Sequence, residues 1–151
     1  IISELESSLI LFFTGASRDS AKIIDDQVKS INQLDGKSLK AMHKVKASSH
    51  KIKELLFKAD ILGVAKEFRW AWEAKKATSS SISNSLIDDI ECNVIDAGAL
   101  SMKVSGAGGG GFMMIIVEPE KKLEVIKVLE KFNGRVHKFQ FTNEGAYSWT
   151  I

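Results

Sequence analysis

The stretch that decides the fold is Lys103-Val104-Ser105-Gly106-Ala107-Gly108-Gly109-Gly110-Gly111-Phe112. Before it, Leu100, Met102 and Val104 alternate with polar residues, which predicts a half-buried strand. After it, residues 112–117 are all apolar, which predicts a second, buried strand. Four successive glycines lose much conformational entropy on ordering, so a packed domain tolerates them where the backbone approaches a ligand or where N–H groups converge on an anion. The alternative is a loose hairpin turn, although a six-residue loop is longer than such strands require.

Two better-known glycine loops do not fit this stretch. Gly106, Gly108 and Gly111 satisfy the pattern G-x-G-x-x-G, but a dinucleotide-binding loop opens a helix, and the residues that follow here predict a strand. A Walker loop requires Lys and then Ser or Thr directly after its last glycine, where this chain has Phe112 and Met113. We therefore expect a strand, a glycine loop and a second strand.

The other elements follow from apolar periodicity. A continuous apolar run at 9–13 predicts a strand covered on both faces, which Thr14-Gly15 ends. Apolar stripes at helical spacing predict four helices, at 17–31 with Ser17 as N-cap, at 39–56, at 61–72 and at 86–94, the last followed by Gly98. A further helix is expected at 119–129, and strands are expected at 137–141 and 147–151. This order predicts an α+β fold, a mostly antiparallel sheet with helices packed against it.

Length and composition indicate an ordinary single domain. The chain has 151 residues, 44% of them hydrophobic and 26% charged, with a net charge of +2. That charge is too small to suggest a nucleic-acid or membrane partner, and no apolar run is long enough to span a bilayer. Cys92 is the single cysteine, which excludes an internal disulfide and favours a reducing, cytoplasmic location. Because the sequence begins at Ile1 and not at methionine, we expect that upstream residues are missing.

The glycine stretch, together with the preceding Ala97-Gly98-Ala99-Leu100, resembles the third conserved motif of the GHMP kinases. In that superfamily the loop lies beside the nucleotide phosphates. The resemblance therefore implies ATP and Mg²⁺ as cofactors, and it implies a nucleotide-binding role for Ser105, Gly106, Ala107, Gly108, Gly109 and Gly110. It also implies a ferredoxin-like domain with additional helices, which agrees with the element order predicted above.

Three other stretches narrow the resemblance. Residues 13–20, 72–76 and 82–88 are similar to segments of the bacterial D-glycero-D-manno-heptose-7-phosphate kinases, which implies a sugar phosphate as the substrate. The candidate substrate-binding residues are then Thr14, Gly15, Ser17, Arg18, Trp72 and Lys75. Ser17 and Arg18 at a predicted helix start offer N–H groups, a hydroxyl and a guanidinium, which suit a phosphate.

Each of these residues also has a structural interpretation. Ser17 could simply cap its helix, and Arg18 could pair with Asp19 or face solvent. Trp72 lies on the apolar stripe of its helix, where core packing competes with stacking on a sugar, and Lys75 could be an ordinary cation at a helix end. The three histidines show no metal-ligand spacing.

No second glycine-rich phosphate loop occurs in the sequence, and no acidic residue flanks the glycine stretch. We therefore assign no catalytic residue and no metal ligand. The resemblance implies that residues 1–151 are the C-terminal domain of a kinase, that the nucleotide loop and the base lie in an N-terminal half, and that this chain alone is inactive. The alternatives are a ferredoxin-like module that binds a small anion without chemistry, or a GHMP kinase for another sugar or a mevalonate-type alcohol.

Overall fold

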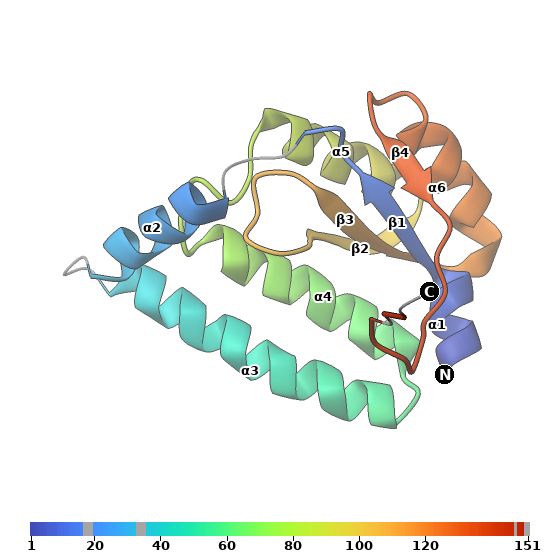
Figure 1. Cartoon of the computed structure of the whole chain (residues 1–151), viewed down its shortest axis with the longest axis horizontal. Helices are drawn as coiled ribbons and strands as arrows, with labels where there is room; N and C mark the ends of the chain where they lie inside the picture. Colours follow the sequence, from blue (N-terminus) through green and yellow to red (C-terminus); the bar gives the residue numbers. More distant parts are fainter. Residues whose placement is uncertain (17–19, 33–35, 147, 150–151) are drawn as a thin grey trace.

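The computed structural model describes residues 1–16, 20–32, 36–146 and 148–149. Within this part, four antiparallel strands form one sheet in the order β2-β3-β1-β4 (Figure 1). The strands are β1 (Leu9–Phe13), β2 (Ala99–Val104), β3 (Phe112–Val117) and β4 (Arg135–His137). A hairpin joins β2 to β3, while helices connect β1 to β2 and β3 to β4. This topology is the ferredoxin-like arrangement, so the predicted fold class is confirmed.

Two helices, α4 and α5, begin at side-chain caps. The Asp60 carboxylate accepts a hydrogen bond from the Gly63 N–H (2.8 Å), and the side-chain oxygen Oδ1 of Asn84 accepts one from the Ile87 N–H (3.2 Å). Gly98, with φ of +102°, follows α5 as predicted. No helix in the described ranges is long and apolar enough to cross a bilayer. The helices are α1 (Ile2–Ser8), α2 (Ser20–Ile31), α3 (Lys37–Phe57), α4 (Ile61–Lys76), α5 (Ser85–Asp96), the short 3₁₀ helix η1 (Pro119–Lys121) and α6 (Lys122–Leu129).

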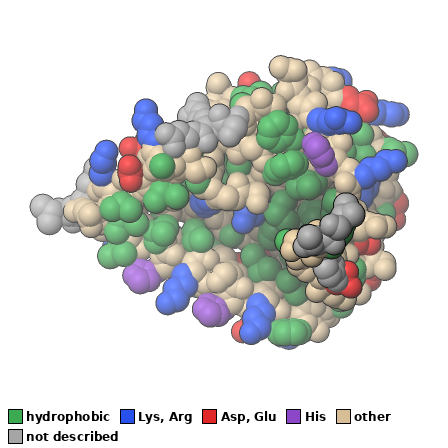
Figure 2. Space-filling model, in the orientation of Figure 1, with side chains coloured by type: hydrophobic (Ala, Val, Ile, Leu, Met, Phe, Trp, Pro, Cys, Tyr) green, Lys and Arg blue, Asp and Glu red, His purple; other side chains and the backbone are tan. Residues whose placement is uncertain are grey.

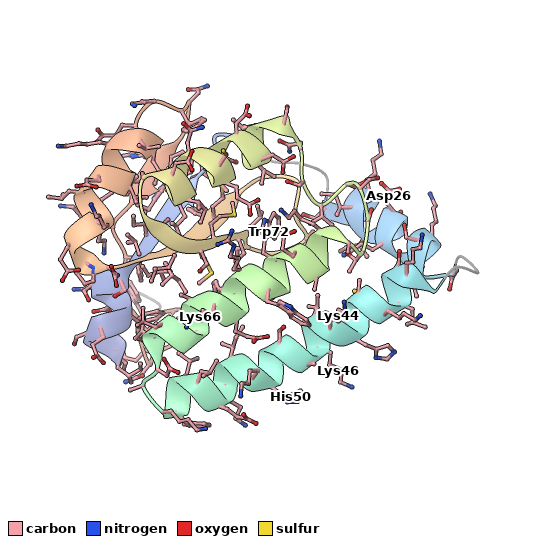
Figure 3. All side chains as sticks on the ribbon, turned by 180° about the vertical axis from the view of Figure 1, so that it is seen from behind. Asp26, Lys44, Lys46, His50, Lys66 and Trp72 are labelled. Atoms are coloured by element: carbon pink, nitrogen blue, oxygen red, sulfur yellow. The ribbon has the colours of Figure 1, made fainter. Side chains whose placement is uncertain are left out.

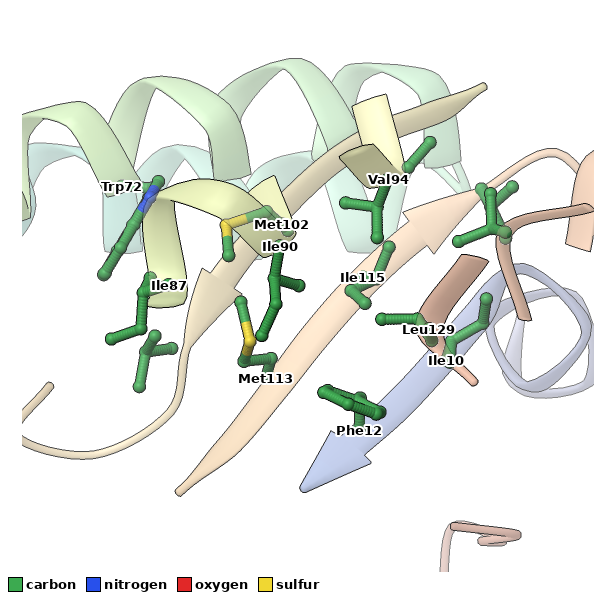
Figure 4. Close-up of a cluster of buried hydrophobic side chains, with 14 of the residues drawn as sticks. Ile10, Phe12, Trp72, Ile87, Ile90, Val94, Met102, Met113, Ile115 and Leu129 are labelled. Atoms are coloured by element: carbon green, nitrogen blue, oxygen red, sulfur yellow. The ribbon is translucent and has the colours of Figure 1, made fainter. Parts of the chain in front are cut away.

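The sheet separates two apolar clusters. The larger one lies between the sheet and helices α5 and α6, and it includes Ile10, Phe12 and Met113 (Figure 4). The smaller one lies on the opposite face, where Leu9 and Ile116 contact Val64 and Ala65 of α4. Helix α3 packs against α4 (Figure 1).

The prediction that β1 is covered on both faces is wrong for part of the strand. Ile10 and Phe12 are buried, but Leu11 and Phe13, on the opposite face, are only half-buried. Helix α4 packs mainly against β2, so it does not extend over this end of β1. Figure 2 shows apolar side chains at the surface, over the sheet and also over α2, where Ile24 and Val28 are each about half exposed.

Other predicted boundaries also change. Helix α1 was not predicted, because a seven-residue element is too short to show a convincing period. The strand expected at 137–141 ends at His137, since the Phe141 N–H donates to a Glu6 carboxylate oxygen (2.8 Å) and the chain leaves β1 for α1. Trp149 is exposed and lies outside any strand, while Tyr147 and Ile151 lie outside the described residues.

Candidate functional site

The glycine loop (residues 105–111) lies near the C-terminal end of α4 and the start of α5 (Figure 1). Two segments of the fold hold it. The Gly109 N–H donates to the Ile82 carbonyl (2.8 Å), and the Asn84 side-chain amide donates to the Gly109 carbonyl (3.1 Å). On the other side, the Gly111 N–H donates to the Ala16 carbonyl (2.8 Å). The loop is therefore fixed to the α4–α5 connection and to the turn after β1.

The glycines in the loop have different physical requirements. Gly108 is buried with φ of +115°, and a Cβ atom there would lie 3.0 Å from the Ile82 carbonyl oxygen. Gly106 also has a positive φ, +75°, but nothing lies within 4 Å of its Cβ position. Gly108 is thus required by packing against the protein, whereas Gly106 borders open space and is exposed.

The loop also presents unused hydrogen-bond donors. The N–H groups of Gly106, Ala107, Gly108 and Gly110 have no acceptor among the described residues. By contrast, the Ser105 N–H donates to the Phe112 carbonyl (2.7 Å) at the end of the hairpin. Three successive free N–H groups in a glycine turn are the usual means by which backbone binds an anion.

Lys75, predicted as a substrate contact, reaches this loop. Its ammonium group donates to the Gly106 carbonyl. Burial, and then the positive charge of Lys103 on β2, lower the pKa of Lys75 to about 8. Burial also lowers the pKa of Lys103. Two half-buried cations therefore lie close to one end of the glycine loop.

The residues predicted in the β1–α2 turn separate into two groups. The Thr14 hydroxyl is buried, accepts from the Gly111 N–H (3.1 Å) and donates to the Ala16 carbonyl (3.2 Å), so it supports the loop. Gly15 is exposed with φ of +75°, and a side chain there would collide with the Asn133 carbonyl. Ser17 and Arg18 lie outside the described residues, and their proposed phosphate contact stays a prediction.

Trp72, predicted as a substrate contact, is a buried core residue. Its side chain is 0% exposed and packs in the larger core, which leaves no ring face for a sugar (Figures 3 and 4). Its indole N–H donates to a Glu91 carboxylate oxygen (3.0 Å), and Lys76 donates to the same oxygen (3.0 Å) and pairs with Glu73 (2.8 Å). We call Trp72, Glu73, Lys76 and Glu91 the paired cluster. The apolar stripe on α4 already indicated this burial.

Sequence reasoning missed two residues of the site. Asn84 caps α5 with its carbonyl oxygen and holds Gly109 with its amide, and its position before an apolar helical stripe was a signal for the first role only. Lys103 begins the glycine stretch, but alternation along β2 did not reveal that its ammonium lies 5.3 Å from the Phe68 ring centroid of α4.

Two other features do not add to the site. No group of three His, Cys, Asp or Glu residues that could hold a metal ion occurs in the part of the chain that the structure describes. A hollow of about 620 Å³ between α1, α6 and β4 shares no lining residue with the glycine loop.

Comparisons with known proteins agree with the resemblance noted above. No family model matches the chain. The chain is 45% identical over all 151 residues to a D-glycero-α-D-manno-heptose 7-phosphate kinase of Campylobacter jejuni, and it spans 44% of that relative. The crystal structure of a proposed sugar kinase from Campylobacter jejuni matches 99% of the chain and 41% of its own length, with 41% identity and a TM-score of 0.67.

A second crystal structure is also similar to the chain. It is a D-glycero-D-manno-heptose 1-phosphate kinase from Bacteroides thetaiotaomicron, 33% identical, with a TM-score of 0.64 over 99% of this chain and 38% of that one. The chain thus spans less than half of each relative, and it corresponds to their C-terminal part. In sequence and fold the chain is similar to the C-terminal part of these GHMP-family sugar kinases.

Proposed function

We propose that the protein carrying this chain is an ATP-dependent sugar kinase, which transfers the γ-phosphoryl group of ATP to a hydroxyl of a sugar phosphate. The supporting observation is the glycine loop, in which successive N–H groups have no acceptor among the described residues and lie beside the half-buried ammonium of Lys75. Phosphoryl transfer depends on positioning and on stabilising negative charge, and such a loop supplies both to a phosphate.

A heptose 7-phosphate is the substrate we propose. The reason is the 45% identity, over the whole chain, to a relative that carries that name. The contribution of this chain is then to hold a phosphate with backbone N–H groups of the loop, Gly106 to Gly108 and Gly110, and to keep that loop in place through Thr14 and Asn84. Arg18 in the β1–α2 turn stays a candidate for the sugar's own phosphate.

ATP reaches kinases as its Mg²⁺ complex, and the ion neutralises charge on the phosphates during transfer. The donors of the glycine loop suit the phosphates themselves. No group of three His, Cys, Asp or Glu side chains that could hold a metal occurs among the described residues. We therefore propose that Mg²⁺ would take its ligands from the phosphates, from water and from residues elsewhere in the protein. We propose an N-terminal half, which would also supply the general base, as the partner of this chain.

The test is a coupled ADP-release assay on the full-length protein with a panel of heptose 7-phosphate, heptose 1-phosphate, unphosphorylated heptose and mevalonate. We expect the highest kcat/KM for heptose 7-phosphate, and no turnover by residues 1–151 alone. If the protein turned over only mevalonate or an unphosphorylated sugar, that compound would replace heptose 7-phosphate as the proposed substrate. Binding of phosphate without any turnover would favour a non-catalytic anion module.

A further inference from the structure

Two half-buried lysines next to the glycine loop have no carboxylate partner among the described residues. Lys75 is in the last turn of α4, and Lys103 is on β2 with its ammonium over the Phe68 ring. Among the described residues neither forms an ion pair, and removing a charge from water costs free energy unless a partner compensates it. We call Lys75 and Lys103 the cationic corner.

The two positive charges of the cationic corner repel each other, which disfavours the protonated form of Lys75. Burial, followed by the charge of Lys103, lowers the pKa of Lys75 to about 8. The carbonyl groups at the C-terminal end of α4, and the Gly106 carbonyl, offset part of the Lys75 charge. They do not account for Lys103, which lies on a strand and contacts an aromatic face.

The free N–H groups of the glycine loop adjoin this corner. Lys75 binds the Gly106 carbonyl, and the Gly106, Ala107 and Gly108 N–H groups have no acceptor in the described part of the chain. Lys75 therefore holds the loop at Gly106 and places a positive charge beside it.

On these grounds we propose that Lys75 and Lys103 together supply the counter-charge for a phosphate dianion bound at the N–H groups of Gly106 to Gly108. The inference rests on the proposed kinase function, in which that phosphate belongs either to ATP or to the sugar phosphate. A dianion completes the corner because it balances two cations that no described carboxylate balances. Both lysines act on the phosphate through charge, and Lys75 also positions the loop.

The test is calorimetric binding of inorganic pyrophosphate to the full-length protein, which needs no turnover. Lys103→Met removes charge without touching Gly106, while Lys75→Gln removes charge and keeps a donor for the Gly106 carbonyl. We expect each variant to weaken pyrophosphate binding about tenfold or more. The control is Lys66→Gln, an exposed lysine on the same helix (Figure 3), which should bind as the wild type does.

The outcomes separate this inference from the proposed function. If both Lys103→Met and Lys75→Gln bind pyrophosphate with wild-type affinity, the cationic corner does not supply counter-charge to the phosphate and the proposal is overturned. It is overturned too if the wild-type protein binds no pyrophosphate. Lysine-dependent binding without kinase turnover would reject the kinase and keep the site.

In an active enzyme, the KM values identify the source of the phosphate. A rise of about tenfold in KM for ATP alone assigns the site to the nucleotide, and a similar rise for the sugar phosphate alone assigns it to the acceptor. Unchanged KM values for both substrates, with full activity, would contradict the proposal.

Discussion

Lys75 and Lys76 are neighbours at the end of α4, yet their surroundings differ. Lys76 belongs to the paired cluster, where Glu73 (2.8 Å) and Glu91 (3.0 Å) compensate its charge. Burial opposes that charge, but the hydrogen bonds to both carboxylates outweigh it and raise the pKa of Lys76. In the cationic corner the pKa of Lys75 is instead lowered to about 8. Lys76 is thus compensated by protein carboxylates, whereas Lys75 has no carboxylate partner among the described residues.

The largest expected effect is on the paired cluster. Trp72→Ala removes a fully buried ring from the core and leaves Glu91 without its indole donor. We expect a loss of about 3–5 kcal/mol in the free energy of unfolding, measured by denaturant titration. Trp72→Phe, which keeps the ring volume in part and loses the hydrogen bond, should cost less. Equal and small losses in both variants would mean that Trp72 is not a core residue.

The loop that adjoins the cationic corner should respond in activity. Gly108→Val places a branched side chain at φ of +115° and against the Ile82 carbonyl. We expect kcat/KM of the full-length enzyme to fall by about a hundredfold or more. The matched control is Gly106→Ala, at a φ of +75° with open space around its Cβ, for which we expect a fall of less than about tenfold. Near wild-type activity in folded Gly108→Val would mean that the loop is only a turn.

Lys76→Met tests the paired cluster directly. The change leaves the half-buried carboxylate of Glu91 without its cation, so we expect the protein to lose about 1–3 kcal/mol of stability by chemical denaturation. Pyrophosphate affinity should stay unchanged, since Lys76 does not contact the glycine loop. A fall in affinity as large as that in Lys75→Gln would remove the distinction between the two lysines.

The smallest expected effect is a pH dependence. The pKa of Lys75 is about 8 in the folded chain and has an ordinary value of 10.5, so the unfolded chain binds the proton more tightly between these values. The free energy of unfolding should therefore rise with pH from about 8 to 10.5 more steeply in the wild type than in Lys75→Met. Lys103, whose pKa burial also lowers, and Lys76 are present in both proteins, so the difference isolates Lys75. If the free energy of unfolding depended on pH identically in the wild type and in Lys75→Met, the pKa of Lys75 would not be lowered in the folded chain.

Local patterns predicted much of the fold and less of the site. The strands around the glycine loop and the long helices follow from apolar period and caps, which act over a few residues. The pairing of β1 with β3, and the early end of β4 at the Glu6 contact, depend on residues far apart in the sequence. For the same reason Lys103 could not be recognised, because its charge matters only beside Lys75 across α4 and β2. Trp72 was placed at the substrate by resemblance, although its own stripe indicated the core.

The most direct test of the difference between the two lysines is thermal unfolding of the full-length protein with and without saturating pyrophosphate. A ligand that binds only the folded state raises Tm. We predict that Lys76→Met has a lower Tm than the wild type but keeps the full increase with pyrophosphate. Lys75→Met should keep the basal Tm, or exceed it, and lose most of the increase. A lowered basal Tm in Lys75→Met together with a full pyrophosphate response would contradict the account.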